Sequence, residues 1–188
     1  MKKLIRRIIA SLLILAIVLS VVFMGGEYLK KNIFYPVKYQ EYVEIYSSEY
    51  SVDKALIYAV INCESGFDPE AVSAAGALGL MQITPETFRW LQTKDDTDET
   101  LADAVLYDPE TNIKYGVLLL SLNIQEFGNV HTALASYNAG RGKVAEWLAD
   151  ERYSTDSRTL ISIPYPETAN YVKKVEKKYK TYREILEN

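Results

Sequence analysis

The sequence opens with a segment that an ordinary water-soluble core cannot explain. Ile8 to Met24 is an uninterrupted run of 17 apolar or small residues, and four Lys and Arg residues precede it. A helix that spans a membrane needs roughly 17–25 such residues. A buried core helix is the weaker explanation, because no polar side chains mark a solvent-facing side of the run. The segment therefore predicts one N-terminal transmembrane helix.

The same segment could instead be the core of a cleaved signal peptide. However, the run is longer than the roughly 7–15 residues of a signal core, and neither an A-x-A-like site nor a Cys for lipid attachment follows it. We therefore expect a retained anchor, with secretion after cleavage as the alternative. More basic residues precede the run than follow it at Lys30 and Lys31, which predicts a cytoplasmic N-terminus and an extracytoplasmic C-terminal part.

The charge and the scarcity of Cys and His exclude several kinds of site. Without residues 1–31 the chain carries 15 basic and 24 acidic groups, a net charge of −9. This charge disfavours nucleic acid, whose binding depends on basic groups that neutralise phosphates. Cys63 and His131 are the only residues of their types, too few for an internal disulfide or a zinc site. We therefore expect neither a metal nor a cofactor, while a glycan remains an acceptable partner.

The remainder of the chain carries helix signals and almost no strand signals. Asp53 precedes an apolar stretch with helical spacing, and Thr84-Pro85 and Asp108-Pro109 each pair a capping residue with a proline at the first helical position. We predict a cytoplasmic tip and anchor over residues 1–31, and a connector with the start of the first helix over 32–44. Residues 45–188 are then one all-α domain.

Glu64 is the first candidate for chemistry. It follows an apolar helix and precedes a loop rich in Ala and Gly that could close over it. Cleavage of a glycosidic bond needs a proton on the leaving oxygen. At neutral pH a carboxylic acid can supply this proton if burial keeps it protonated. Position alone does not distinguish Glu64 from an ordinary glutamate at the end of a surface helix.

The neighbourhood of Glu64 provides the distinction. Residues 64–69 read E-S-G-F-D-P, Ser73 follows nine positions after the glutamate, and residues 76–83 read G-A-L-G-L-M-Q-I. A P-x-T helix start follows at residues 85–87. The segment closely resembles the signature of the soluble lytic transglycosylase family, which belongs to the lysozyme superfamily.

Three further blocks resemble the same family in order and spacing. They are D-P with N-I and G within residues 108–116, A-L-A-S-Y-N-A-G at 133–140, and I-P-Y-P-E-T with Y-V within 163–172. The resemblance covers about residues 45–180, which is most of the part expected outside the membrane. It implies a lysozyme-like helical domain cut by a glycan groove.

The resemblance also implies roles for individual residues. Glu64 matches the single catalytic acid and base of the family. The residues expected to bind substrate are Ser73, Met81, Gln82, Tyr137, Asn138 and Glu167. Met81 could equally fill the core, and Tyr137 matches a tyrosine close to the catalytic carboxyl.

The resemblance implies cleavage of the bond between N-acetylmuramic acid and N-acetylglucosamine in peptidoglycan. In such enzymes the glutamate protonates this bond, and the N-acetyl carbonyl of the muramoyl sugar stabilises C1. The glutamate then takes a proton from the C6 hydroxyl, which attacks C1 and leaves a 1,6-anhydro end. The sequence predicts no particular protein partner.

Two alternatives stay open from the residues themselves. A hydrolytic muramidase of the same fold would use a second carboxylate about 5–9.5 Å from the first, and Asp68 and Glu70 are the nearest in sequence. A non-catalytic wall-binding scaffold would have no need of Glu64. Thr84 stands where methionine is frequent in the family, which leaves subsite preference open.

Overall fold

The computed structural model describes residues 15, 17–22, 24–26, 29–95 and 100–187, which form two compact units, residues 1–38 and 39–188. The division falls within the predicted connector. Residues 8–14, 16 and 23 of the predicted anchor lie outside the described residues. Within the described part, no helix is both long enough and apolar enough to cross a membrane. The first unit also contains a short π-helix, η1 (Lys30–Phe34).

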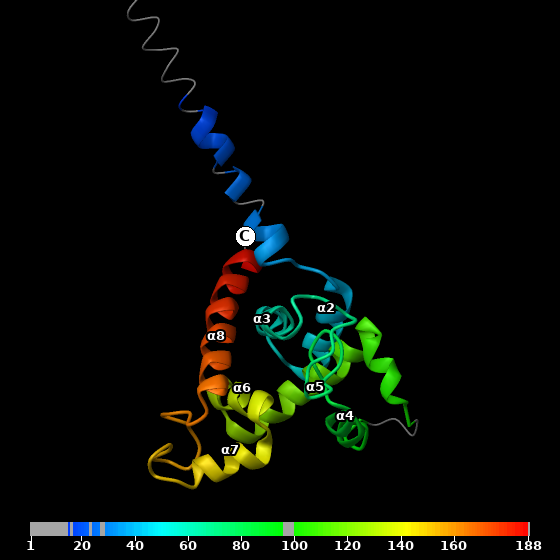
Figure 1. Ribbon diagram of the computed structural model, residues 1–188, viewed down its shortest axis with the longest axis vertical. Helices are drawn as coiled ribbons and strands as arrows, with labels where there is room; N and C mark the ends of the chain where they lie inside the picture. Colours follow the sequence, from blue (N-terminus) through cyan, green and yellow to red (C-terminus); the bar gives the residue numbers. More distant parts are fainter. Residues whose placement is uncertain (1–14, 16, 23, 27–28, 96–99, 188) are drawn as a thin grey trace, which may run out of the picture. The chain divides into compact units, whose positions relative to one another are not determined.

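The second unit is built from helices (Figure 1). They are α2 (Gln40–Tyr50), α3 (Lys54–Glu64), α4 (Pro85–Gln92), η2 (Asp103–Tyr107), α5 (Pro109–Phe127), α6 (Val130–Ala139), α7 (Arg141–Leu148) and α8 (Pro166–Glu187). The described residues of this unit contain no strand, only two isolated bridges in the loop after α3. The predicted all-α domain is therefore confirmed.

The predicted capping residues begin three of these helices. The side chains of Asp53, Thr84 and Asp108 each accept a hydrogen bond from a backbone N–H two or three residues further on. Such bonds satisfy N–H groups that lack a partner at a helix start. Gly128 ends α5 with φ +71°, a conformation that costs glycine little.

Two helices organise the core of the second unit. α5 packs against α2, α4 and α6, and α8 packs against α3 and α6 (Figure 1). All residues of α3 from Ala55 to Ile61 are buried. A helix that is apolar on every side is stable only when neighbours surround it. The helix that ends at Glu64 is therefore enclosed by its neighbours up to Ile61, and its last three residues are partly exposed.

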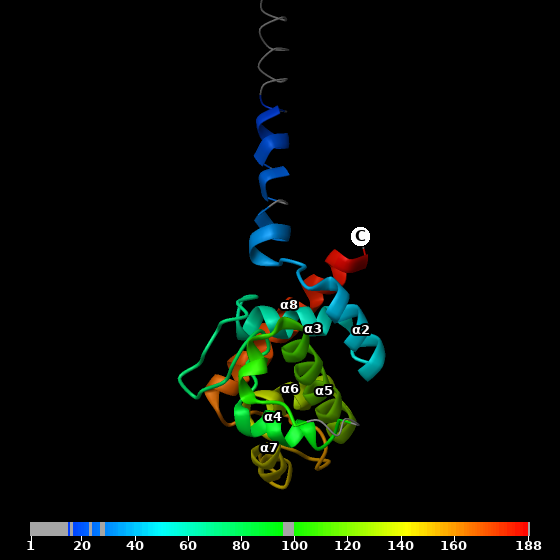
Figure 2. The same ribbon diagram turned by 90° about the vertical axis from the view of Figure 1, so that its right-hand side faces the viewer.

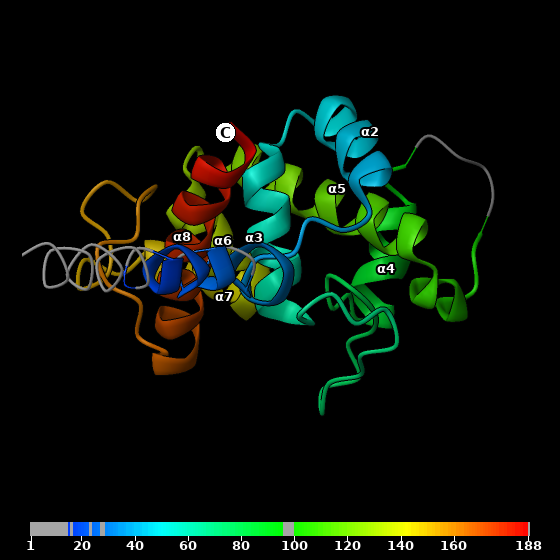
Figure 3. The same cartoon turned by 90° about the horizontal axis from the view of Figure 1, so that it is seen from above.

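The loop over residues 65–84 extends beyond the helices next to the end of α3 (Figures 2 and 3). Val72 and Leu78 form one isolated bridge, and Leu78 and Ile83 form another. The hydroxyl of Ser65 donates to the carbonyl of Leu80 over 2.8 Å and so joins the end of α3 to the far side of the loop. These contacts give the loop a defined shape without a regular element.

The side chain of Asn112 on α5 binds the same loop by hydrogen bonds. Its side chain is fully buried; its Oδ1 accepts from the backbone N–H of Met81 at 2.7 Å. Its Nδ2 donates to the carbonyls of Leu78 at 2.9 Å and Leu106 at 2.7 Å. A buried amide with all three bonds satisfied is a stable and specific link. One side chain thus fixes the loop against α5 and η2.

Two glycines allow this close approach. A Cβ on Gly79 would collide with the side chain of Asn112 and the carbonyl of Leu106, and the φ of Gly79 is +74°. A Cβ on Gly116, one turn after Asn112, would collide with the side chain of Met81. Packing of the loop on α5 therefore explains Asn112 and Gly116 of the block at residues 108–116.

Candidate active site

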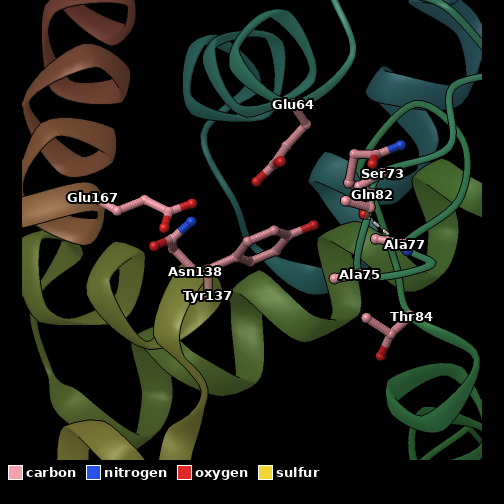
Figure 4. A pocket seen from close by; sticks show the side chains of 10 residues that line it. Glu64, Ser73, Ala75, Ala77, Gln82, Thr84, Tyr137, Asn138 and Glu167 are labelled. Atoms are coloured by element: carbon pink, nitrogen blue, oxygen red, sulfur yellow. Dashed lines mark hydrogen bonds between the residues drawn. The ribbon is translucent and has the colours of Figure 1, made fainter. Parts of the chain in front are cut away.

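A pocket of about 440 Å³ opens where α3, the loop after it, the end of α6 and the start of α8 meet (Figure 4). Its lining residues are Glu64, Ser73, Ala74, Ala75, Ala77, Gln82, Thr84, Tyr137, Asn138 and Glu167. These residues come from four segments that are up to about a hundred positions apart in the sequence. The pocket contains most of the residues singled out from the sequence.

Glu64 is the last residue of α3, and its carboxyl group points into the pocket (Figure 4). Burial raises the pKa of Glu64 from 4.5 to about 7, and a contact with the Tyr171 hydroxyl partly opposes the rise. Burial acts in this direction because it disfavours the charged carboxylate. Near neutral pH the group can therefore both give and take a proton, as a general acid and base must.

Tyr171 on α8 is a residue whose place beside Glu64 the sequence did not reveal. In the sequence it stands only as part of the Y-V block at residues 171–172. Its ring is buried, and its hydroxyl has no hydrogen-bond partner at standard distance among the described residues. Burial, and next the charge of Glu64, raise the pKa of Tyr171 well above 10. The phenol thus stays neutral and favours the carboxylate form of Glu64.

Tyr137, near the end of α6, lies beneath the carboxyl group of Glu64 in Figure 4. Its hydroxyl donates a 2.8 Å hydrogen bond to the carbonyl of Met81. Burial and the charge of Glu64 raise the pKa of Tyr137 well above 10. A phenol whose pKa is raised in this way stays protonated near neutral pH and remains a hydrogen-bond donor.

Met81 itself is a correction to the sequence analysis. Its side chain is fully buried and packs against Gly116, away from the lining of the pocket. The expectation that Met81 binds substrate is therefore wrong for the side chain, and the alternative of a core residue holds. Its backbone still matters to the site, because it is bonded on one side to Asn112 and on the other to Tyr137.

Ser73 and Gln82 line the loop side of the pocket. The hydroxyl of Ser73 accepts from the backbone N–H of Ala77 at 3.0 Å. The amide of Gln82 donates to the carbonyls of Ala71 at 3.1 Å and Gly79 at 2.8 Å. Both side chains are oriented by the loop, so they are polar groups with fixed positions.

Asn138 and Glu167 line the opposite end of the pocket (Figure 4). Glu167 lies in the first turn of α8 and is exposed. Thr84 and the alanines at 74, 75 and 77 also line the pocket, and the sequence did not predict them as site residues. The one signal for Thr84 was that it stands at a position where the family often has methionine.

The two acids nearest to Glu64 in sequence do not line the pocket. Asp68 and Glu70 are exposed, and Asp68 accepts from the backbone N–H of Glu70 at 3.0 Å in a local turn. Among the described residues, the second carboxyl group of the pocket is that of Glu167. Cys63 next to Glu64 is no nucleophile, since burial raises the pKa of its thiol to about 11.

An all-α domain with a carboxyl group of raised pKa in an open pocket has the features of the lysozyme-like class. Comparison with known proteins identifies the family within this class. The transglycosylase SLT domain family matches residues 41–160. The match covers most of the chain, and the chain belongs to this family.

Relatives and solved structures agree with the family. The soluble lytic murein transglycosylase of Escherichia coli (strain K12) is 35% identical over 143 residues, 75% of this chain and 22% of that protein. The membrane-bound lytic murein transglycosylase C of Actinobacillus pleuropneumoniae serotype 5b (strain L20) is 28% identical over 169 residues, 79% of this chain and 46% of that protein. An inactive glutamate-to-glutamine variant of lytic transglycosylase Slt from Pseudomonas aeruginosa superposes with a TM-score of 0.72 at 31% identity, over 81% of this chain and 25% of that one.

This chain thus spans about a fifth of the soluble relative's length. What the two share is the domain that carries the pocket.

Proposed function

We propose that the chain is a peptidoglycan lytic transglycosylase that cleaves the β-1,4 bond between N-acetylmuramic acid and N-acetylglucosamine. The observation that carries the proposal is Glu64, a carboxyl group with a pKa of about 7 in a polar pocket of a lysozyme-like helical domain. The related proteins named as lytic murein transglycosylases support the choice of substrate.

The first step is protonation of the leaving oxygen by Glu64. Because the pKa of Glu64 is about 7, a large fraction of the enzyme carries this proton near neutral pH. As the bond to the leaving oxygen breaks, C1 of the muramoyl sugar becomes electron-poor, and its own N-acetyl carbonyl oxygen bonds to it. The leaving sugar departs with the proton from Glu64.

The second step uses the same group as a base. The carboxylate of Glu64 removes the proton from the C6 hydroxyl of the muramoyl sugar, and the C6 oxygen attacks C1 and displaces the N-acetyl oxygen. The product carries a 1,6-anhydro bridge, and Glu64 is again protonated. No water is consumed, so one carboxyl group suffices for both steps.

The remaining pocket residues bind and orient the glycan. Ser73 and Gln82 offer polar atoms on the loop side, and Asn138 and Glu167 offer them at the other end. The phenols of Tyr137 and Tyr171 stay neutral, and they place two dipoles beside the carboxyl group of Glu64. The alanines at positions 74, 75 and 77 leave room for sugar rings beside the loop.

Analysis of the product tests this proposal. Purified sacculi are digested with the full-length chain, and the released muropeptides are measured by mass spectrometry. A lytic transglycosylase releases 1,6-anhydromuramoyl ends, which are lighter by one water than hydrolysed ends. Release of hydrolysed ends alone would reject the transglycosylase reaction while keeping the fold and the substrate.

A hydrolytic muramidase is the second candidate, and one observation favours it. Glu167 places a second carboxyl group on the pocket, which a two-carboxylate hydrolysis could use to activate water. In that reaction Glu167→Gln would abolish activity as Glu64→Gln does. In the transglycosylase it weakens glycan binding and leaves the anhydro product.

We further propose that residues 8–24 anchor the protein in the membrane, with the N-terminus cytoplasmic and the catalytic domain outside. The described apolar residues from Leu15 to Met24 are helical and 51–69% exposed, as a helix in contact with lipid would be. Protease added to spheroplasts should digest the domain, and the intact protein should sediment with membranes. A soluble mature form beginning near residue 25 would instead identify a cleaved signal.

A further inference from the structure

Tyr165 is a half-exposed aromatic residue directly before α8. Its backbone carbonyl accepts from the N–H of Ala169 at 2.9 Å, so the residue caps the helix. Its side chain is 49% exposed. The mechanism above gives this side chain no role.

The ring of Tyr165 is held in place by Trp147 of α7. The two ring centroids are 5.0 Å apart, with an interplanar angle of 73°. Trp147 itself is only 6% exposed, so it is a rigid support. Edge-to-face pairs of this kind contribute about 0.5–1.5 kcal/mol beyond the area they bury. The exposed part of Tyr165 is thus a preformed aromatic surface.

This surface lies at the Glu167 end of the pocket. Tyr165 is two residues before Glu167, whose side chain lines the pocket. The supporting helix α7 begins at Arg141, shortly after Asn138, which lines the same end. In Figure 3 the start of α8 and the loop after α3 lie on either side of the end of α3, and both contribute residues to the pocket. Tyr165 does not line the pocket itself, but it directly precedes the turn of α8 that carries Glu167, so it is the nearest exposed aromatic residue in sequence to that end.

The charges around Tyr165 indicate which part of peptidoglycan it can meet. Lys143 of α7 interacts electrostatically with Tyr165, but its ammonium is paired with Glu146 at 2.7 Å. Glu167 follows Tyr165 two positions later in the sequence. Because the ammonium of Lys143 already has a partner, it offers little attraction to the carboxylates of a stem peptide. Binding of a neutral sugar does not depend on a free cation.

We propose that Tyr165 is a specificity-determining residue, an aromatic platform that binds the apolar face of a pyranose ring one position beyond the Glu167 end of the pocket. A pyranose presents axial C–H groups on its face and hydroxyls at its rim. The ring of Tyr165 matches the face, and the polar side chains of Glu167 and Asn138 match the rim, the usual mixture in ligand sites. The inference rests on the proposed function and names an additional part of its substrate site.

The test is steady-state cleavage of glycan strands of defined length by the full-length chain. Tyr165→Ala should raise KM about tenfold on long strands, with kcat changed less than about twofold and the pH profile unchanged. Tyr165→Phe keeps the ring and should match the wild type. Ile45→Ala is the matched control, because Ile45 is similarly exposed at 45% but lies on α2, which contributes nothing to the pocket.

Tyr165→Leu serves if the Ala variant loses its fold, because leucine keeps apolar bulk against Trp147 but offers no ring face. It should raise KM as Ala does. An unchanged KM in a folded Ala or Leu variant would overturn the platform, and so would a loss in Tyr165→Phe equal to that in Tyr165→Ala.

Strands without stem peptides show whether Tyr165 binds the sugar or the stem peptide. The effect of Tyr165→Ala should persist on peptide-free strands, and its disappearance there would mean that the residue contacts peptide and not sugar. If the wild type cleaves nothing, the proposed function fails, and the affinity of the wild type and Tyr165→Ala for uncleaved peptide-free strands still decides the inference. Equal affinities would then refute it.

Discussion

The hydroxyl of Tyr137 donates a 2.8 Å hydrogen bond to the backbone carbonyl of Met81. This bond joins the end of α6 to the loop that follows α3, and the backbone N–H of Met81 is bonded in turn to Asn112 on α5. The end of α6, the loop and α5 are thereby tied together at one residue, Met81. The phenol has a structural partner as well as a place in the pocket.

Tyr137→Phe should therefore lower activity without unfolding the protein. Phenylalanine keeps the ring but leaves the Met81 carbonyl without its donor, at a cost of about 1–3 kcal/mol for an unsatisfied buried acceptor. We expect kcat to fall at least tenfold. The free energy of unfolding should fall by about 1–3 kcal/mol. Urea unfolding and digestion of sacculi measure the two effects. A variant with wild-type values in both would show that the hydrogen bond positions nothing.

The pH dependence of activity should follow the ionisation of Glu64. Its pKa in the free enzyme is about 7, and the first step needs the protonated form. We expect kcat/KM on glycan strands to fall tenfold per pH unit above about 7. Rates between pH 5 and 9 measure this limb. A flat profile up to pH 9 would mean that another group supplies the proton.

The raised pKa of Glu64 also destabilises the folded protein at high pH. Because the native state holds this proton more tightly than the unfolded chain, the free energy of unfolding falls as the pH rises from about 4.5 to about 7. The full effect is on the order of 3 kcal/mol. Glu64→Gln should therefore be more stable than the wild type at pH 8 and within about 1 kcal/mol of it at pH 5. If Glu64→Gln and the wild type were equally stable at both pH values, the pKa of Glu64 in the folded protein would lie near 4.5.

The close packing of the loop on Asn112 can be tested at Gly79. Gly79→Ala should destabilise the domain by about 3 kcal/mol or more, because the new Cβ collides with Asn112 and Leu106 at a positive φ. Gly128→Ala is the control: its φ of +71° is similar, but nothing lies within 4 Å of its Cβ. It should cost about 1 kcal/mol. Equal losses would mean that backbone conformation, and not packing on Asn112, decides the requirement for glycine.

The sequence predicted the helices well where local chemistry decides the outcome. The starts at Asp53, Thr84 and Asp108 depend on a side chain and an N–H two or three residues away, and all three were found. Most of the pocket could also be predicted, because Glu64 and Tyr137 stand within motifs of a family with a shared fold.

What the sequence could not provide are contacts between distant segments. Met81 is apolar and lies next to Gln82, so only the packing against Gly116 shows that it points into the core. Tyr171 follows the apolar spacing of α8, and its approach to Glu64 depends on how α8 packs against α3. The support of Tyr165 by Trp147 likewise depends on the path of the irregular segment between α7 and α8.

The central claim is that Glu64 alone provides both the acid and the base. Glutamine at this position keeps the shape and the hydrogen bonding but cannot give or accept the proton. General acid–base catalysis contributes roughly 10²–10⁴-fold. Because one group serves both steps, we expect Glu64→Gln to lose activity at or beyond the upper end of that range while binding to glycan strands is largely retained.

The direct measurement is release of anhydromuropeptides from purified sacculi by Glu64→Gln, with Asp68→Asn and Glu70→Gln as controls at exposed acids outside the pocket. The account predicts no detectable anhydro product from Glu64→Gln and activity within about tenfold of the wild type for both controls. Near-normal release by Glu64→Gln, or an inactive Asp68→Asn, would contradict it.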